Sequence, residues 1–249
     1  MIPKAAYHRV LIKVSGEAFC GSGGFGIDPS ALEAFITELL PVRQMGVQIG
    51  LVVGGGNIFR GRSLAEAGLI ARPTADAMGM LATVMNALAL GDALAGRQYG
   101  HPSGRGVKVS VMSARPTADV CEPFTRSRAI EHLEAGRIVI LAGGTGNPFF
   151  TTDTCAALRA GEIGAEVLMK ATKVDGVFDS DPADNPEAKK FDRITYDEVL
   201  ARRLGVMDLS AVSMCMEAAI PIIVFRMDKP GNLAAAVAGE NAGTIVSDN

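Results

Sequence analysis

Short apolar runs rich in β-branched residues alternate along this chain with longer segments whose apolar residues recur at helical spacing. The short runs predict strands, and most are nearly continuous in Val, Ile and Leu, as in strands buried on both faces. The predicted strands are 9–14, 47–53, 107–112, 137–142, 166–171, 221–225 and 244–246. The predicted helices are 29–45, 75–94, 126–135, 152–163, 196–203 and 209–219. The alternation predicts an α/β fold, a mainly parallel central sheet flanked by helices on both faces.

Helix 29–45 has clear boundary signals. Asp28 is placed to cap its start, Pro29 suits its first position and Gly46 follows its end. Pro41 lies late in the segment and predicts a kink or an early end.

Composition narrows the class of protein. The 249 residues are 48% hydrophobic and 20% charged, which is enough for a large core in one domain or two small ones. A formal net charge of -3 gives no basic field, so no nucleic-acid partner is expected. The 4 cysteines never form Cys-x-x-Cys and are expected to be reduced packing residues. The amino terminus lacks the apolar core of a signal peptide, and no apolar run suggests a membrane span, so we expect a cytoplasmic protein without a membrane partner.

The most informative segment is 143–153, GGTGNPFFTTD, which follows a predicted strand and opens a predicted helix. Ligands of open α/β sheets bind beyond the carboxyl ends of the strands. Unpaired N–H groups at the start of a helix favour an anion there. We therefore expect a ligand at this edge of the sheet.

Two more strand ends carry residues suited to phosphate. Lys13 ends the first predicted strand, and Ser15 and Gly16 follow as candidate donors. Phosphoryl transfer relies on positive charge and positioned donors, although a lone lysine at a strand end more often extends into solvent. After the second strand, segment 54–56 is three glycines, which suits close approach of backbone to a ligand. Arg60 could hold a phosphate there; a tight turn with a surface arginine is the equally weighted alternative.

A fourth strand end, 170–178, has the sequence KATKVDGVF. Lys170 and Lys173 flank the end of the predicted strand, and one of them could reach a nucleotide's phosphates. A hairpin with solvated charges explains this segment by itself equally simply. Which lysine would act is open at this point.

The common nucleotide-binding motifs and histidine-based catalysis do not account for this sequence. Segment 21–26 satisfies G-x-G-x-x-G but is separated from the preceding strand, and no acidic strand end follows at the required distance, which disfavours a dinucleotide fold. No P-loop motif occurs. None of the 3 histidines lies in a glycine-rich turn, which disfavours histidine-based catalysis.

Taken together, these segments resemble the amino acid kinase family and, within it, the bacterial uridylate kinases. The matching segments, which span nearly the whole chain, are 13–18, 21–28, 54–61, 76–86, 144–153, 170–178 and 206–209. The first and third are shared across amino acid kinases, whereas 76–86 and 144–153 are more specific to uridylate kinases.

The resemblance implies a single domain of the three-layer amino acid kinase fold over 1–249, with a UMP-binding part of about 1–164 and an ATP-binding part of about 165–249. It implies direct in-line phosphorylation of UMP to UDP by ATP with Mg²⁺, and leaves the metal ligands unassigned. The implied catalytic residues are Lys13, Asp153 and Lys170. The implied ATP-binding residues are Lys13, Ser15, Gly16, Gly56, Arg60, Thr172, Phe178 and Asp181. The implied UMP-binding residues are Gly55, Asp76, Thr145, Gly146, Asn147, Pro148, Phe149, Phe150, Thr151 and Thr152.

The resemblance further implies a homohexamer, activation by GTP and inhibition by UTP. The implied effector segment is Gly21, Ser22, Gly23, Gly24, Phe25 and Gly26. Gly91 and Ala95 stand where such relatives carry Arg and His, and loop 98–106 looks lengthened. The sequence therefore predicts that GTP does not activate several-fold.

Two other functions fit the sequence less well. A kinase of the same fold acting on aspartate, acetylglutamate or carbamate would need a carboxylate pocket in place of segment 144–153. A storage or regulatory protein could bind nucleotide without turnover, which the presence of Lys13, Asp153 and Lys170 argues against.

Overall fold

The described strands of the chain form one sheet. The computed structural model describes residues 3–95, 97, 106–117, 119–205 and 207–248. Among these residues the strands join in the order β4-β3-β5-β2-β1-β6-β8-β9-β7. Their bounds are β1 Arg9–Val14, β2 Gln48–Val53, β3 Val109–Ser113, β4 Glu122–Pro123, β5 Ile138–Ala142, β6 Val167–Thr172, β7 Arg193–Ile194, β8 Ile222–Arg226 and β9 Gly243–Val246. All paired neighbours are parallel except β8 and β9. The predicted α/β class with a mainly parallel sheet is confirmed.

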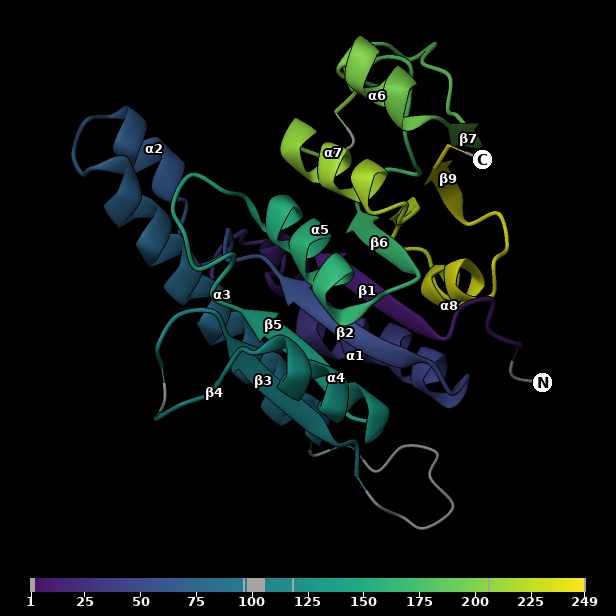
Figure 1. Cartoon of the computed structure of the whole chain (residues 1–249). Helices are drawn as coiled ribbons and strands as arrows, with labels where there is room; N and C mark the ends of the chain where they lie inside the picture. Colours follow the sequence, from purple (N-terminus) through teal and green to yellow (C-terminus); the bar gives the residue numbers. More distant parts are fainter. Residues whose placement is uncertain (1–2, 96, 98–105, 118, 206, 249) are drawn as a thin grey trace.

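Helices cover both faces of the sheet (Figure 1). One core cluster packs beneath α1 (Pro29–Gln44), α3 (Arg72–Ala95), α8 (Asn232–Val237) and the 3-10 helix η1 (Gly16–Phe19). The opposite cluster packs beneath α4 (Arg126–Glu134), α5 (Thr152–Ile163), α6 (Tyr196–Arg202) and α7 (Leu209–Glu217). The short α2 (Gly61–Glu66) precedes α3. In Figure 1, α2 and the start of α3 form an arm at the upper left.

The strand β1 shows why the apolar runs are continuous. Val10, Ile12 and Val14 belong to the cluster under α1, whereas Leu11 belongs to the cluster under α5. Side chains of a strand alternate between the two faces of the sheet, so both faces need apolar residues. The same alternation assigns Lys13 to the α5 face.

The structure excludes one of the two outcomes predicted for helix α1 at Pro41, an early end. The cap of α1 is as expected, since the Asp28 side chain accepts a hydrogen bond from the Ala31 backbone N–H at 2.8 Å. The helix does not end early at Pro41 but continues to Gln44. An internal proline costs about 3 kcal/mol, and complete burial of one aliphatic side chain contributes about 1.5–3 kcal/mol. The buried Leu40 and Val42 offset this cost.

Sequence pattern missed the shortest elements, namely β4, β7, η1, α2 and α8. None is longer than 6 residues, which is too short for a periodicity to be recognised. The expected long loop 98–106 lies, apart from Gly106, outside the described residues.

The helix α3 is long and apolar enough to cross a membrane by length and composition. Half of its most apolar window is buried in the fold, where it packs on the sheet. This is the behaviour of a core helix, so its composition is weak evidence for a membrane span.

Candidate active site

The four strand ends singled out in the sequence meet at one edge of the sheet. β5, β2, β1 and β6 are consecutive neighbours and all parallel. Their carboxyl ends therefore point the same way, toward the turns that follow each of them. The four segments therefore converge at one edge of the sheet.

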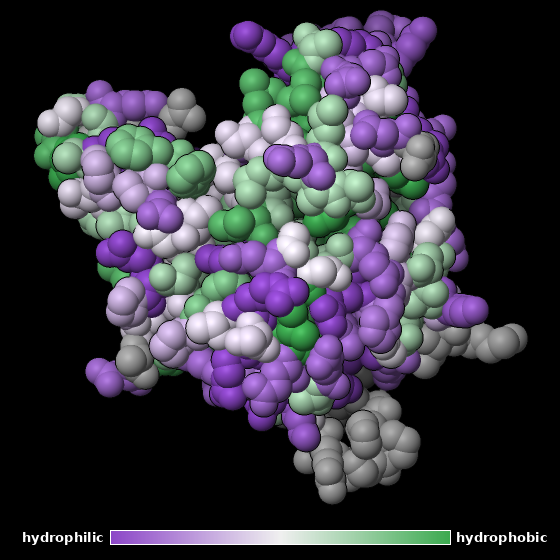
Figure 2. All heavy atoms as spheres, in the orientation of Figure 1, coloured by the Kyte–Doolittle hydropathy of each residue, from purple (hydrophilic) through white to green (hydrophobic). Residues whose placement is uncertain are grey.

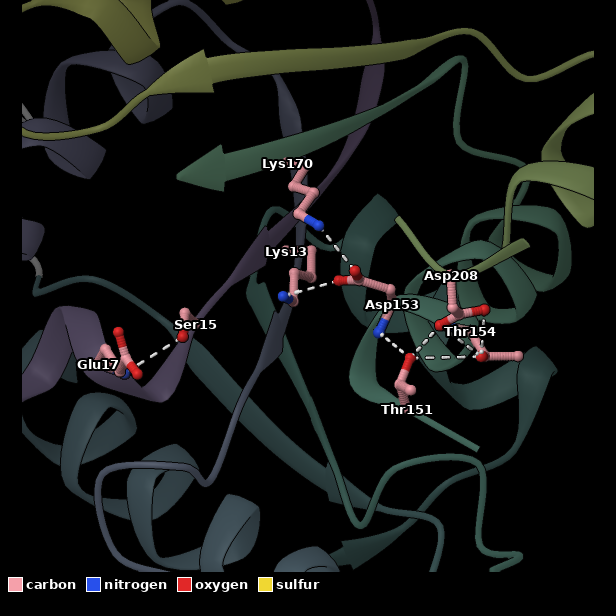
Figure 3. Close-up of polar contacts among 8 residues, drawn as sticks. All are labelled: Lys13, Ser15, Glu17, Thr151, Asp153, Thr154, Lys170 and Asp208. Carbon is pink, nitrogen blue, oxygen red and sulfur yellow. Dashed lines mark hydrogen bonds and ion pairs between the residues drawn. The ribbon is translucent and has the colours of Figure 1, made fainter. Parts of the chain in front are cut away.

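Lys13, Lys170 and Asp153 form a compact charged cluster at this edge (Figure 3). Lys13 and Lys170 are register partners on β1 and β6. Asp153 lies in the first turn of α5. Its Oδ1 lies 2.7 Å from Lys13 Nζ, and its Oδ2 accepts a hydrogen bond from Lys170 Nζ at 2.7 Å. One carboxylate thus holds both lysines.

The cluster is largely shielded from solvent, with side-chain exposures of 10% for Lys13, 14% for Asp153 and 16% for Lys170. Burial acts to raise the pKa of Asp153, but the charges of Lys13 and Lys170 outweigh it and hold that pKa below its usual value. Burial lowers the pKa of Lys170, and the Asp153 charge only partly opposes this. The three groups carry a combined charge of one positive unit when ionised, which favours an anion.

The start of α5 is fixed by threonine hydroxyls. Thr151 caps the helix, and its Oγ1 accepts hydrogen bonds from the backbone N–H groups of Asp153 at 3.0 Å and Thr154 at 3.2 Å. The hydroxyls of Thr151 and Thr154 both donate to the carboxylate of Asp208, the residue that caps α7. Asp153 is therefore carried by a helix terminus tied to a second helix.

The turn after β1, which contains Gly16, packs directly against the three-glycine turn 54–56 after β2. A Cβ at Gly16 would lie 2.4 Å from Asn57 Oδ1 and 2.9 Å from the Gly54 carbonyl oxygen, so any larger side chain would displace the turn. Asn57 and Asn86 are buried, and the amide of Asn86 donates to the Gly54 carbonyl and to Asn57 Oδ1, both at 2.7 Å. A buried amide pair thus sets the path of the glycine turn.

A cavity of about 210 Å³ opens between the glycine turn, α3 and segment 144–152. Figure 2 shows the surface hollowed between the arm formed by α2 and α3 and the part of the molecule that carries α6 and α7. Of the residues expected to bind UMP, those that line the cavity are Gly55, Asp76, Thr145, Asn147, Phe150, Thr151 and Thr152. Gly146, Pro148 and Phe149 are not among the lining residues. Gly56, expected near ATP phosphates, also lines this cavity.

Asp76 already has partners in this cavity. Both carboxylate oxygens accept hydrogen bonds from Arg72 Nε, at 2.8 and 2.9 Å, and Oδ2 also accepts one from the Phe149 N–H at 2.8 Å. Phe149 has a φ of 72°, a left-handed conformation unusual for a bulky residue. Asp76 therefore helps to hold the turn after β5 in a strained conformation.

A second cavity, of about 560 Å³, begins at Lys170 and extends between β6, β8 and segment 202–205. Thr172, Phe178 and Asp181, the residues expected at the adenosine, all line it. Lys13 and Ser15 line a separate cleft beside it, on the side of α1. Lys170 borders both spaces.

The remaining expected residues lie around the edge. Arg60 and Lys173 both pair with Glu17, at 2.8 and 3.1 Å, and these pairs lower the pKa of Glu17, the Lys173 hydrogen bond most strongly. Segment 21–26 is tied to the glycine turn, because the N–H of Gly26 donates to the Asn57 carbonyl at 2.8 Å.

Sequence reasoning missed several residues of the site. They are Glu17, Asn57, Phe59, Asn86, Met80, Thr83, Thr154, Asp208 and segment 202–205. Asn57, Asn86 and Asp208 lie in segments that resemble the uridylate kinases, and this resemblance was the only sequence signal for them. Their roles could not be predicted from it, because their contacts join positions far apart in the chain.

The described residues contain no group of three or more His, Cys, Asp or Glu side chains that could hold a metal ion. Mg²⁺ in phosphoryl transfer keeps several waters and relies largely on substrate phosphates. The residues at this edge therefore fit a Mg²⁺ ion that arrives with a nucleotide better than one held by the protein.

Fold and site together describe an α/β protein in which two lysines and one aspartate lie beside glycine-rich strand ends at the carboxyl edge of a mainly parallel sheet. A model of the amino acid kinase family matches residues 8–226, and this chain belongs to that family. It is 52% identical to a uridylate kinase of Legionella pneumophila over 247 residues, covering 99% of this chain and 96% of the relative. It is also 52% identical to a uridylate kinase of Vibrio cholerae over 246 residues, covering 99% and 98%. The crystal structure of UMP kinase from Bacillus anthracis superposes with a TM-score of 0.91 at 38% identity, covering 98% of this chain and 97% of that one.

Proposed function

We propose that this protein is a nucleoside monophosphate kinase that transfers the γ-phosphoryl group of ATP to UMP, forming UDP and ADP for pyrimidine nucleotide synthesis. The uridylate kinases above, related over nearly the full chain, support this reaction. The observation that carries it is the Lys13–Asp153–Lys170 cluster, next to one cavity lined by residues expected at UMP and another lined by residues expected at adenosine.

The roles follow from charge and position. A phosphate oxygen of UMP attacks the γ-phosphorus of ATP, and the bond from that phosphorus to the bridging oxygen breaks as ADP leaves in line. The acceptor is already an anion, so alignment and charge neutralisation matter more than a strong base. Lys13 and Lys170 stabilise the transferring group, and Asp153 orients both ammonium groups. Mg²⁺, bound with the phosphates, would supply further charge neutralisation.

Lys170 is the better candidate for the second phosphate lysine. Its ammonium lies in the shielded cluster, whereas the side chain of Lys173 is 77% exposed and pairs with Glu17. Residues 1–164 would bind UMP through Asp76 and the turn after β5. Residues 165–249 would bind the adenosine through Thr172, Phe178 and Asp181.

The assembly and its control are further parts of the proposal. The exposed face of α3 carries Met78, Leu81 and Met85 at helical spacing, exposed by 40%, 52% and 54%, which supports a contact between copies within a homohexamer. UTP, as an end-product analogue, would inhibit, and GTP would have little effect. Nothing in the proposed chemistry requires a membrane, and we expect the enzyme to work in the cytoplasm.

The decisive experiment measures product formation from ATP and Mg²⁺ with UMP, and with CMP, aspartate and acetylglutamate as parallel acceptors. We expect UDP from UMP and no comparable transfer to the others. Transfer to an amino acid acceptor would refute the substrate. Nucleotide binding without transfer to any acceptor would favour a storage or regulatory protein.

A further inference from the structure

Asp208 connects the two helices that flank the charged cluster, and no role follows for it from the sequence. Its carboxylate lies at the start of α7, 57 residues beyond Thr151. Figure 3 shows its oxygens directed toward Thr151 and Thr154, next to Asp153 on the same helical turn. The contacts therefore join the segment expected to bind adenosine to the one expected to bind UMP.

Both carboxylate oxygens of Asp208 accept hydrogen bonds, and the donors are two hydroxyls and one backbone N–H. Oδ1 accepts from the Ala211 N–H at 2.9 Å, and both oxygens lie 3.0 Å from Thr154 Oγ1. Thr151 Oγ1 donates its single hydrogen to Oδ2. A hydroxyl has one hydrogen and two lone pairs, so both lone pairs of Thr151 remain for the N–H groups of Asp153 and Thr154.

A carboxylate is required for this arrangement. An amide at position 208 would offer one oxygen and one NH₂ group. With the oxygen kept toward Ala211, the NH₂ would face the Thr151 hydroxyl, whose lone pairs are already occupied. With the amide turned over, the cap of α7 would be lost. Either way, one of the two helix starts loses its partner.

We propose that Asp208 is a positioning residue, which holds the first turn of α5 so that the Asp153 carboxylate stays between Lys13 and Lys170. The proposal rests on the proposed kinase function for its effect on turnover. Its structural part, the ordering of the α5 start, can be measured without any substrate. Displacement of a reacting group by about 1 Å can cost about 100-fold in rate, so a modest loosening is sufficient.

The test compares Asp208→Asn with Asp28→Asn in the full-length protein. Asp28 caps α1 through an equivalent bond to the Ala31 N–H, but the described residues include no threonine hydroxyl donating to it. We expect Asp208→Asn to lower kcat by about 10- to 100-fold with little change in either KM. Asp28→Asn should keep kcat within about twofold, since Asn caps helices as well as Asp.

A second pair of variants tests the hydroxyl contacts. Thr154→Val removes the hydroxyl donated to Asp208 and should lower kcat, whereas Thr154→Ser keeps it and should restore most of the rate. The effects of Thr154→Val and Asp208→Asn should be strongly non-additive, because both break the same contact. Additive effects would contradict a shared role.

The pH profile provides a readout that a merely structural role would not move. The charged groups acting on Lys170 are Asp153, Lys13 and Asp208, and the Asp208 charge raises the pKa of Lys170. Removing that charge should move the alkaline limb of kcat to lower pH. An unmoved limb, with activity lost only in proportion to folded protein, would overturn the proposal in favour of a structural role.

Amide hydrogen exchange keeps the proposal testable if the substrate is wrong. In the ligand-free protein, Asp208→Asn should speed exchange at the Asp153 and Thr154 N–H groups, whereas Asp28→Asn should not. Unchanged exchange there would overturn the proposal. If the unmodified protein forms no UDP, the proposed function fails separately, and the exchange result still decides the role of Asp208.

Discussion

Replacing Asp153 by Asn should separate what this carboxylate contributes to the fold from what it contributes to turnover. The substitution keeps the shape of the side chain and removes its charge. Lys13 and Lys170 are then left close together in a shielded site without the anion that both contact. We expect a folded but less stable protein with strongly reduced activity.

The size of the stability change follows from the burial of the cluster. Breaking a buried ion pair by removing one partner costs about 3–5 kcal/mol. The side chains retain 10–16% exposure, so we take the lower end. For a chain of this length, about 3 kcal/mol corresponds to a fall in Tm of roughly 6–12 °C.

The measurement is thermal unfolding with and without ATP, combined with UDP formation. Nucleotide phosphates return negative charge to the lysines, so saturating ATP should raise the Tm of Asp153→Asn more than that of the unmodified protein. kcat should fall by about 100-fold or more. An unchanged Tm together with unchanged turnover would refute the reasoning, since neither ion pair could then matter.

The pKa shift of Asp153 adds a direction to this test. Its pKa is lowered in the folded protein, so the stabilisation is present above the unfolded value of about 3.9 and is lost as pH falls through the folded pKa. The difference in Tm between the two proteins should therefore shrink in acid. A difference that grows in acid would contradict the assignment of the shift to the lysines.

Four further outcomes are expected. Asp76→Ala should raise the KM for UMP with a smaller effect on kcat, provided that circular dichroism and Tm show an intact fold; equal losses in a misfolded variant would make its role structural. Gly16→Ala should reduce both stability and turnover because its Cβ would lie 2.4 Å from Asn57 Oδ1, whereas Gly161→Ala, with open space at its Cβ, should fold and react normally. As pH rises, the rate of the unmodified enzyme should begin to decline before the pH reaches the usual lysine pKa of about 10.4, because burial lowers the pKa of Lys170. GTP titrated into an initial-rate assay should give less than about twofold activation, and several-fold activation would refute this prediction.

Helical spacing and buried strand runs predicted the long elements well, because each element carries its own periodicity. α5 was predicted with both ends correct, and β1 likewise. The convergence of the strand ends was also predictable, since parallel strands share their carboxyl edge. What could not be predicted was the order of the strands, which brings β6 rather than a later strand next to β1.

Gly91 illustrates a residue whose meaning changed once the strand order was known. In the sequence it was only a departure from the effector-site pattern of the resembling family. In the structure its backbone lies close to β3, and a Cβ there would fall 2.7 Å from Val111 Cγ2. Close packing of α3 on the sheet therefore gives a physical reason for glycine at this position, whatever the response to GTP.

The polar contacts of the site depend on the order of the strands in the sheet. Lys13 and Lys170 are register partners only because β1 and β6 are neighbours, and Asp153 reaches both only because α5 packs on the face to which they point. Two ammonium groups so placed would repel each other, and one carboxylate between them reduces that repulsion while leaving net positive charge for a phosphate. A second carboxylate facing the lysines would cancel this attraction. The oxygens of Asp208 point instead toward the hydroxyls of Thr151 and Thr154 (Figure 3), and Oδ1 also accepts a hydrogen bond from the backbone N–H of Ala211. Its carboxylate fixes the start of the helix that carries Asp153. Of the charges that act on Lys170, that of Asp208 has the weakest effect, so the lysines keep net positive charge for an incoming anion.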